Sequence, residues 1–246
     1  MKLLPSRNDH DLSPANHLAT LEAVYSRRFL TKDERRHDEI WREIAGFLQR
    51  HVPEDARVLD LGCDRGDFIR NIRAAERWAV DLRDVSRGLT PDIHFTAANG
   101  LQLDDHFAPG FFDVVFMSNY LEHLPSTYAV IEQLQVVSRL LRPGGRVIVL
   151  QPNIRLIGSK YWDFIDHRVP LTERSLGEAG RLAGYRQEEM IVRFLPFTTK
   201  SRIPQDHRLV RLYLKFPPIW RLMGKQTLYV GRKPGGPGGT PTIAST

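Results

Sequence analysis

The sequence has little cysteine and no long hydrophobic run at its start. Cys63 is the only cysteine among 246 residues, which excludes an intramolecular disulfide framework and agrees with a reducing compartment. The opening Met1-Lys2-Leu3-Leu4 is followed at once by Pro5 and by polar and charged residues, so we expect neither a signal peptide nor a membrane span there. These absences predict a cytoplasmic protein.

Acidic residues are scarce in one long stretch of the chain. Between Thr198 and Lys233, nine Lys and Arg residues accompany a single acid, Asp206, so this stretch carries a formal charge of +8. The whole chain has a net charge of +6, and its remainder is therefore slightly acidic. Charge segregated in this way indicates an anionic partner such as a membrane surface, a phosphate or a nucleic acid, although a solvated basic face has the same composition.

Short apolar runs alternate with amphipathic stretches along most of the chain. Apolar residues recur at helical spacing in 33–49, 128–141 and 172–183, and Thr172 is the expected N-cap of the last helix. Strands are expected at 57–61, 78–82, 93–96, 112–117, 145–150, 188–194 and 226–232. This alternation predicts an α/β fold, a Rossmann-like seven-stranded and mostly parallel sheet with helices on both faces.

The remaining segments are placed around this pattern. Residues 1–32 mix polar residues with prolines and predict a loose N-terminal arm, and 33–233 form the expected domain. A helical basic insert is expected at about 198–225, before the last strand, and Pro217-Pro218 would divide it into two short helices. The end of the chain, 234–246, is rich in Gly and Pro and is expected to be disordered.

A glycine-containing turn follows the first expected strand. Between Asp60 and Gly66 a buried strand runs into a tight turn, and a helix is expected to start near Asp67. Gly62 permits a ligand to approach the backbone closely, and Gly66 permits the turn into the helix. Ligands of open α/β sheets bind at the carboxyl ends of the strands, so this turn predicts a nucleotide site.

The charge of the turn distinguishes between nucleotides. A dinucleotide fingerprint needs three glycines, but Asp64 occupies the middle position and Asp60 ends the strand. Two carboxylates would repel a pyrophosphate, whereas they attract the cationic amine and sulfonium of S-adenosylmethionine. Asp81 closes the second strand, where an acid can accept hydrogen bonds from both ribose hydroxyls. The turn therefore favours a methyl donor over a nicotinamide dinucleotide.

Four motifs in order carry a family resemblance. Residues 57–150 resemble the class I S-adenosylmethionine-dependent methyltransferase superfamily, close to its small-molecule branch. Residues 60–66 resemble the donor-binding loop, Asp81 the ribose-binding acid, 112–124 the fourth-strand motif and 141–148 the turn into strand five. The resemblance implies S-adenosylmethionine as cofactor, bound by Asp60, Gly62, Cys63, Gly66, Asp81, Asn99, Gly100, Ser118 and Asn119.

The chain departs from the family's pattern at two positions. Glycine is usual where Asp64 stands, which alters the loop or its contact with the methionine amine. An acid is usual beside the adenine amino group, where this chain has Asn99. The amide oxygen of Asn99 can still accept that hydrogen bond, so we expect the donor site to be retained.

Two histidines are candidates for a catalytic base. Methyl transfer is an in-line displacement that depends on positioning, and an oxygen acceptor must also lose its proton. His123 follows the fourth strand and His167 follows the fifth, where Asp166 is expected to orient the His167 ring. Helix capping or packing is the alternative role for His123. No metal-ligand cluster is apparent, and Cys63 is expected to be a buried contact of the turn rather than a nucleophile.

The acceptor is less sharply defined. Residues 151–155, 161–172 and 193–199 look similar to a bacterial methyltransferase subgroup associated with cell-envelope or glycan biosynthesis, which implies a small or lipid-linked acceptor such as a sugar hydroxyl. In 208–225, apolar and basic residues interleave, which predicts peripheral contact with the inner face of a membrane, or else packing on the sheet. An RNA methyltransferase and a non-enzymatic anionic-lipid-binding protein are the alternatives. A nucleic-acid partner is disfavoured because no RNA-binding module is recognisable.

Overall fold

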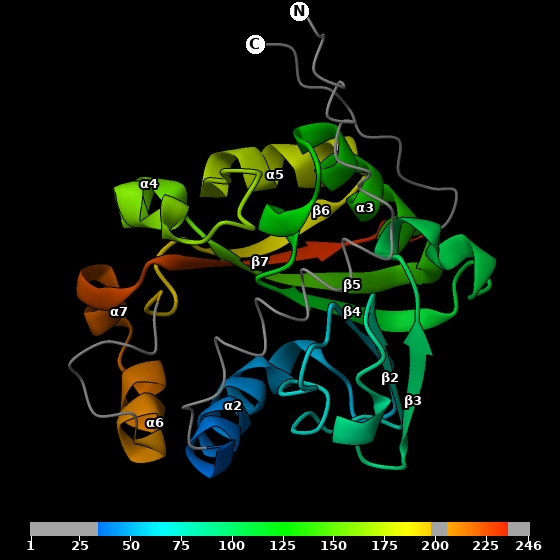
Figure 1. Cartoon of the computed structure of the whole chain (residues 1–246), viewed down its shortest axis with the longest axis horizontal. Coiled ribbons are helices and arrows are strands. Elements are labelled where there is room, and N and C mark those ends of the chain that lie inside the picture. The colour runs from blue at the N-terminus through cyan, green and yellow to red at the C-terminus, as the bar shows by residue number, and fades with distance from the viewer. Residues whose placement is uncertain (1–33, 198–205, 236–246) are drawn as a thin grey trace, which may run out of the picture. The chain divides into compact units, whose positions relative to one another are not determined.

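A seven-stranded sheet forms the centre of the structure (Figure 1). The computed structural model describes residues 34–197 and 206–235, so the expected arm at 1–32, the first part of the insert and most of the expected tail lie outside the described residues. The strand order is β3-β2-β1-β4-β5-β7-β6. The strands are β1 (Arg57–Leu61), β2 (Glu76–Asp81), β3 (Ile93–Ala97), β4 (Phe112–Ser118), β5 (Leu141–Pro152), β6 (Arg186–Ile191) and β7 (Gln226–Arg232).

The direction of the strands confirms the expected mostly parallel sheet. Strands β1 to β5 pair in parallel, and β7 runs antiparallel to both of its neighbours, β5 and β6. Because β5 and β6 are each antiparallel to β7, they point the same way. The carboxyl ends of all strands except β7 therefore meet at one edge of the sheet.

Helices cover both faces of the sheet, as expected, and each face has its own hydrophobic core. On one face pack α3 (Thr127–Leu140) and α5 (Glu173–Leu182), with the short α4 (Ile154–Ile157) on the same side in Figure 1. On the other face lie α2 (Glu34–Leu48) and the two helices of the insert, α6 (His207–Lys215) and α7 (Pro217–Met223). Pro217-Pro218 separates the two insert helices as the sequence predicts. None of the helices in the described ranges is both long and apolar enough to cross a membrane.

The segment after the glycine turn is a series of turns rather than the expected helix. In an α-helix the backbone N–H of Asn71 would bond to the carbonyl of Asp67. Here the side-chain amide of Asn71 donates to that carbonyl at 2.9 Å, and the Asn71 backbone N–H bonds to Phe68 instead. A side chain that occupies a main-chain acceptor competes with the helix, and the prediction of a helix starting near Asp67 is therefore wrong.

Helix α5 begins at a capping box around the expected N-cap. The Thr172 hydroxyl accepts from the Ser175 backbone N–H at 3.2 Å, and the Ser175 hydroxyl accepts from the Thr172 backbone N–H at 2.9 Å. We expect Thr172→Ala to lower the free energy of unfolding by about 1 kcal/mol, because the helix loses a cap. Urea unfolding would measure this loss, with exposed Thr127→Ala as the matched control. An equal loss in both variants would contradict the capping role.

Candidate functional site

The turn after β1 is held against β2 by backbone hydrogen bonds. The backbone N–H groups of Gly62 and Cys63 both donate to the carbonyl of Val80, at 2.8 and 3.1 Å. Gly62 and Gly66 have φ angles of +73° and +70°, which glycine adopts without strain. The chain thus reverses at the carboxyl edge of the sheet, where the sequence predicts the donor loop.

Two predicted residues of this turn, Asp60 and Cys63, are buried. The side chain of Asp60 is buried, which raises its pKa well above the usual range although the backbone N–H of Ile69 opposes the shift. Burial likewise raises the pKa of the Cys63 thiol, with a further contribution from the Asp60 carboxyl. A thiol that stays protonated is a poor nucleophile, which agrees with a packing role for Cys63.

Asp81 lies at the end of β2 within an ionic cluster that the sequence did not reveal. Its carboxylate accepts from the backbone N–H of Asp64 at 3.0 Å and from that of Arg83 at 2.9 Å. The Arg83 guanidinium bridges Asp81, at 3.1 Å, and Asp64, at 2.6 Å. Asp64 is therefore paired with a cation, and the side chains of Asp64, Arg83 and Asp81 together carry a formal charge of −1. The sequence could have indicated this ion pair, since Arg83 stands two residues after Asp81.

The side chain of Tyr120 shapes the space beside Gly62 and Gly100. A β-carbon at either glycine would overlap the Tyr120 ring or its hydroxyl. The Tyr120 hydroxyl donates to Gln133 at 2.9 Å, and the Gln133 amide donates to the Gly100 carbonyl at 2.9 Å. The group that approaches the backbone of Gly62 in this structure is thus an aromatic ring of the same chain. Sequence reasoning missed Tyr120, although an aromatic residue directly after Asn119 was visible.

The other expected donor-site residues lie at the same edge. Asn99 is exposed, and its amide oxygen accepts from the backbone N–H of Leu101 at 3.0 Å, which leaves a second lone pair for a ligand. Asn119 directly follows β4 with a φ of +46°, and its side-chain amide donates to the Ser118 hydroxyl at 3.2 Å. The fold therefore brings the nine predicted residues to one edge.

A second group of residues forms where the segment after β5 crosses the end of β4. The backbone carbonyl of Glu122 accepts from the N–H groups of Arg168 and Val169, at 2.8 and 3.0 Å. These bonds place His167 against His123, with 5.2 Å between the ring centroids. The two candidate histidines, 44 residues apart in sequence, are therefore neighbours in the structure.

Asp166 contacts His123, not only the neighbouring residue that we expected it to orient. The Nδ1 atom of His123 lies 3.0 Å from the Asp166 carbonyl and 3.3 Å from its carboxylate. The His167 ring is stacked on Phe164, with centroids 4.9 Å apart, and packs against Tyr161. The chain turns at Phe164–His167, and the carboxylate of Asp166 therefore also comes close to the other histidine.

The glycine turn, the acid at the end of β2 and the sheet order can now be set beside known proteins. A family model described as a methyltransferase domain matches residues 33–189, more than half of the chain. The chain belongs to this family. It is an enzyme of the methyltransferase class, and S-adenosylmethionine is its expected cofactor.

Solved structures share the fold of this methyltransferase. An S-adenosylmethionine-dependent methyltransferase from Thermotoga maritima matches with a TM-score of 0.63 at 16% identity, over 90% of this chain and 100% of the other. One from Archaeoglobus fulgidus matches with a TM-score of 0.57 at 16% identity, over 77% and 93%. A geranyl diphosphate C-methyltransferase from Streptomyces coelicolor matches with a TM-score of 0.54 at 15% identity, over 77% and 75%. A comparison with curated proteins gave no match.

The residues at the edge of this methyltransferase fit the expected cofactor. Asp81 presents carboxylate oxygens at the end of β2, as a ribose diol requires, and the cluster of Asp64, Arg83 and Asp81 keeps one negative charge. That charge is favourable for a sulfonium and an ammonium group. Because Arg83 already bonds Asp81, the ribose of the cofactor would have to share this carboxylate with the guanidinium.

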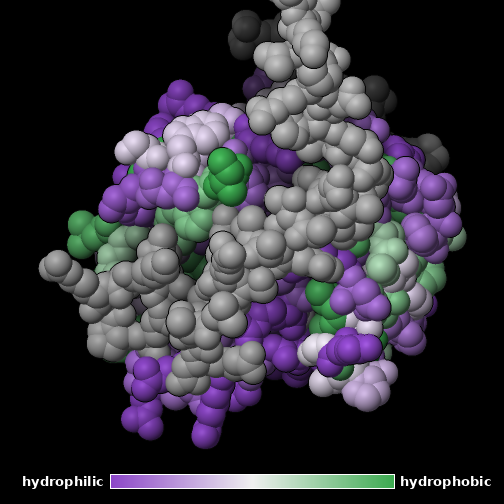
Figure 2. Space-filling model, viewed as in Figure 1, coloured by the Kyte–Doolittle hydropathy of each residue, from purple (hydrophilic) through white to green (hydrophobic). Residues whose placement is uncertain are grey.

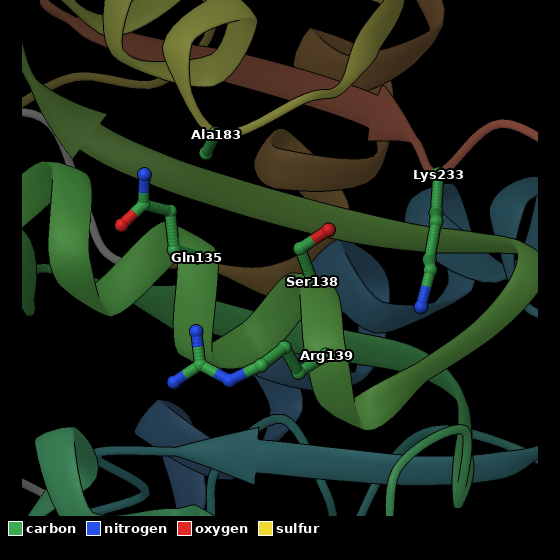
Figure 3. A pocket seen from close by; sticks show the side chains of 5 residues that line it. All are labelled: Gln135, Ser138, Arg139, Ala183 and Lys233. Carbon is green, nitrogen blue, oxygen red and sulfur yellow. The ribbon is translucent and has the colours of Figure 1, made fainter.

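A hollow of about 340 Å³ lies away from this edge (Figure 3). It is lined by Gln135, Ser138, Arg139, Ala183 and Lys233. Its two cations have partners, because Arg139 pairs with Asp104 and the Lys233 ammonium donates to the carbonyl of Leu141 at 2.7 Å. Leu141 begins β5, so the hollow is at the opposite end of the strand from the histidines and is no candidate for the active site.

We expect Gly100→Ala to destabilise the methyltransferase by about 1–3 kcal/mol, because the new β-carbon would overlap the Tyr120 hydroxyl and the Gln133 amide. Gly88→Ala is the matched control, since no atom lies within 4 Å of a β-carbon there. Adding Tyr120→Phe to Gly100→Ala should restore part of the loss, as measured by urea unfolding. Equal stability of the two glycine variants would refute the packing of Tyr120 described above.

Proposed function

We propose that the enzyme transfers the methyl group of S-adenosylmethionine to a small or lipid-linked acceptor, and that the acceptor atom is an oxygen such as a sugar hydroxyl. The observation that carries the proposal is the pair His123 and His167, which lies at the same sheet edge as the donor turn. An oxygen acceptor needs help to lose its proton, and histidines are the side chains suited to that task near neutral pH.

The donor would be held by the residues around the turn after β1. In this proposal the backbone of 62–66 and the side chains of Asp81 and Asn99 bind the nucleoside, with Asp60, Cys63, Gly100, Ser118 and Asn119 completing the walls. When bound, S-adenosylmethionine supplies an electrophilic methyl group. The protein's own contribution is to fix the distance and the line between that group and the acceptor.

The acceptor side would be organised by His123 and His167. A carbonyl can only accept, so the contact with Asp166 requires Nδ1 of His123 to carry a proton, and in the neutral ring Nε2 then presents its lone pair. A lone pair held in one direction can receive a proton or contact an acceptor hydroxyl. The rings of Phe164 and Tyr161 fix the plane of His167 beside it.

The donor site is tested by calorimetric titration with S-adenosylhomocysteine. We expect the wild-type protein to bind it and Asp81→Asn to bind at least about tenfold more weakly, because a hydrogen bond to a charged acceptor contributes about 1.5–3 kcal/mol. Asp84→Asn is the matched control, since Asp84 is exposed three residues further on. Folded wild-type protein that binds neither S-adenosylhomocysteine nor S-adenosylmethionine would overturn the proposal.

We also propose that helices α6 and α7 contact an anionic membrane surface that holds the acceptor. The structure divides the apolar residues of the insert, because Leu214 and Trp220 are buried while Leu212, Phe216 and Leu222 are 64%, 56% and 82% exposed. Exposed Arg208, Arg211, Lys215 and Arg221 lie among them. In Figure 2 hydrophobic side chains gather at the left, over α7, with hydrophilic ones below, over α6 and α2. Apolar and basic side chains on one surface suit an interface with anionic head groups.

A hollow beside α7 supports an acceptor with an apolar tail. It measures about 450 Å³ and lies between the end of β6 and α7. Its lining residues are Met190, Ile191, Val192, Arg193, Pro217, Trp220 and Arg221. Apolar walls with two guanidinium groups suit a hydrocarbon chain joined to an anionic group. The similar geranyl diphosphate C-methyltransferase is a protein with such a substrate.

Vesicle flotation tests the membrane contact. With phosphatidylglycerol vesicles at low salt, we expect the wild-type protein to float and the double variant Phe216→Ser/Leu222→Ser to lose about tenfold or more of its partition, because about 1.5–3 kcal/mol is gained for each fully buried apolar side chain. Leu182→Ser is the matched control, since Leu182 is 60% exposed on α5, on the other face of the sheet. Wild-type protein that stays unbound, or a double variant that floats as well as the control, would contradict the contact.

A further inference from the structure

Three potential metal ligands from distant parts of the sequence meet at the histidine pair. Glu122 and His123 belong to the single turn Leu121–His123 after β4, and His167 comes from the segment after β5. Each offers one ligand atom, and these three atoms all lie within 4.8 Å of one another. The sequence showed no such cluster, because 44 residues separate the histidines.

The carboxylate of Glu122 is unusual because it is fully buried and neither of its oxygens has a hydrogen-bond partner of normal geometry among the described residues. Burial raises its pKa, and the nearby His123 and the Gln151 amide oppose that shift only in part. A buried carboxyl without strong partners is costly unless something neutralises it.

The space between Glu122 and His123 has the right size for an ion. The Nε2 atom of His123 lies 3.9 Å from Oε1 of Glu122, which is too far for a hydrogen bond. Two ligand atoms that are each about 2.0–2.2 Å from one metal ion are about 3–4 Å apart. This pair is therefore already at coordinating separation, and the separations to His167, which are within 4.8 Å, need an adjustment of at most about 1 Å.

The tautomer of His123 is fixed by the same kind of contact that fixes the tautomer of metal-binding histidines. The Asp166 carbonyl and carboxylate lie 3.0 and 3.3 Å from Nδ1, so that nitrogen holds the proton and Nε2, on the side of Glu122, presents its lone pair. Histidines that bind metals almost always donate their other N–H to a carboxylate or carbonyl in this manner. A purely structural ion pair between Glu122 and His123 would bring the two side chains to hydrogen-bond distance, which is not the case.

We propose that Glu122, His123 and His167 bind one divalent transition-metal ion, with Zn²⁺ as the best match. Two imidazoles and one carboxylate are a donor set of catalytic zinc sites, and three protein ligands leave a coordination position open. The three residues lie at the carboxyl edge of the sheet, where the acceptor is proposed to bind. The buried Glu122 charge is then compensated by the ion.

The role of this ion in the reaction rests on the proposed function. An ion at this position would lower the pKa of an acceptor hydroxyl and let its proton pass to solvent. The acceptor oxygen then forms the new bond to the methyl carbon, while the carbon–sulfur bond of the donor breaks and its electron pair stays on sulfur as a neutral thioether. In the mechanism with a bound ion, the two histidines serve as metal ligands and do not themselves take the proton of the acceptor hydroxyl.

Metal binding is tested on the full chain without any acceptor. After removal of bound metal by a chelator, Co²⁺ is added and its visible absorption is recorded, and Zn²⁺ is titrated by calorimetry. We expect one equivalent to bind with the intense visible bands of low coordination, and Glu122→Gln and His167→Asn each to weaken Zn²⁺ binding at least 100-fold. His94→Asn is the matched control, an exposed histidine on β3 that should bind as the wild type does.

A thermal melt separates loss of the site from loss of the fold. Glu122→Gln keeps the shape of the side chain and removes its charge, so the metal-free variant should melt no lower than the metal-free wild type. Zn²⁺ should then raise the melting temperature of the wild type but not of the variant. A wild type with no Co²⁺ absorption and no Zn²⁺ binding, or variants that bind like the wild type, would overturn the metal site.

The donor site provides the check that keeps the two proposals apart. His167→Asn should bind S-adenosylhomocysteine as tightly as the wild type, because His167 lies outside the donor turn. Normal S-adenosylhomocysteine binding without Zn²⁺ binding would overturn the metal site alone. Zn²⁺ binding by a protein that takes up no S-adenosylhomocysteine would keep the metal site and overturn the proposed methyl transfer.

Discussion

The arrangement of the candidate site depends on two hydrogen bonds that the backbone carbonyl of Glu122 accepts from Arg168 and Val169. They fasten the segment after β5 to the turn after β4, two stretches that the parallel sheet brings to one edge. Without them, His167 and Asp166 would have no fixed relation to His123. A loop held by main-chain bonds to a packed strand end is positioned better than one held by side chains alone, and the proposed acceptor side is held in this way.

The donor side is organised by charge instead. Arg83 joins Asp81 to Asp64, and the backbone N–H of Asp64 donates to Asp81, so the glycine turn and the end of β2 form one unit. Asp64 also adopts a φ of +45°, a conformation that glycine would adopt more easily. The ion pair with Arg83 offsets that cost. A ribose bound at Asp81 would share the carboxylate with the Arg83 guanidinium. A chain with glycine at position 64 would lack the second partner of that guanidinium.

The sheet and the turn were predictable because their signals are local. Apolar periodicity located every strand, and Gly62 and Gly66 marked the turn, since each depends only on neighbouring residues. The helix after Gly66 failed because one side chain, that of Asn71, takes a main-chain acceptor. The partners of His123, and the packing of Tyr120 over Gly62, depend on contacts across 40 residues or more, which no periodicity encodes.

The two proposed halves of the acceptor site are compatible in their spacing. Leu150 of β5 and Ile191 of β6 pair with the same residue of β7, so the ends of the two strands are separated by about 10 Å, two strand spacings. His123 follows β4 and His167 lies in the segment after β5, and the apolar hollow begins at the end of β6. Strands β4 and β6 are three strand spacings apart, so an acceptor with its hydroxyl at His123 needs a hydrocarbon tail longer than about 14 Å to reach the hollow beside α7. Leu212, Phe216 and Leu222 are exposed on α6 and α7, so the proposed membrane contact would lie on the side of the hollow.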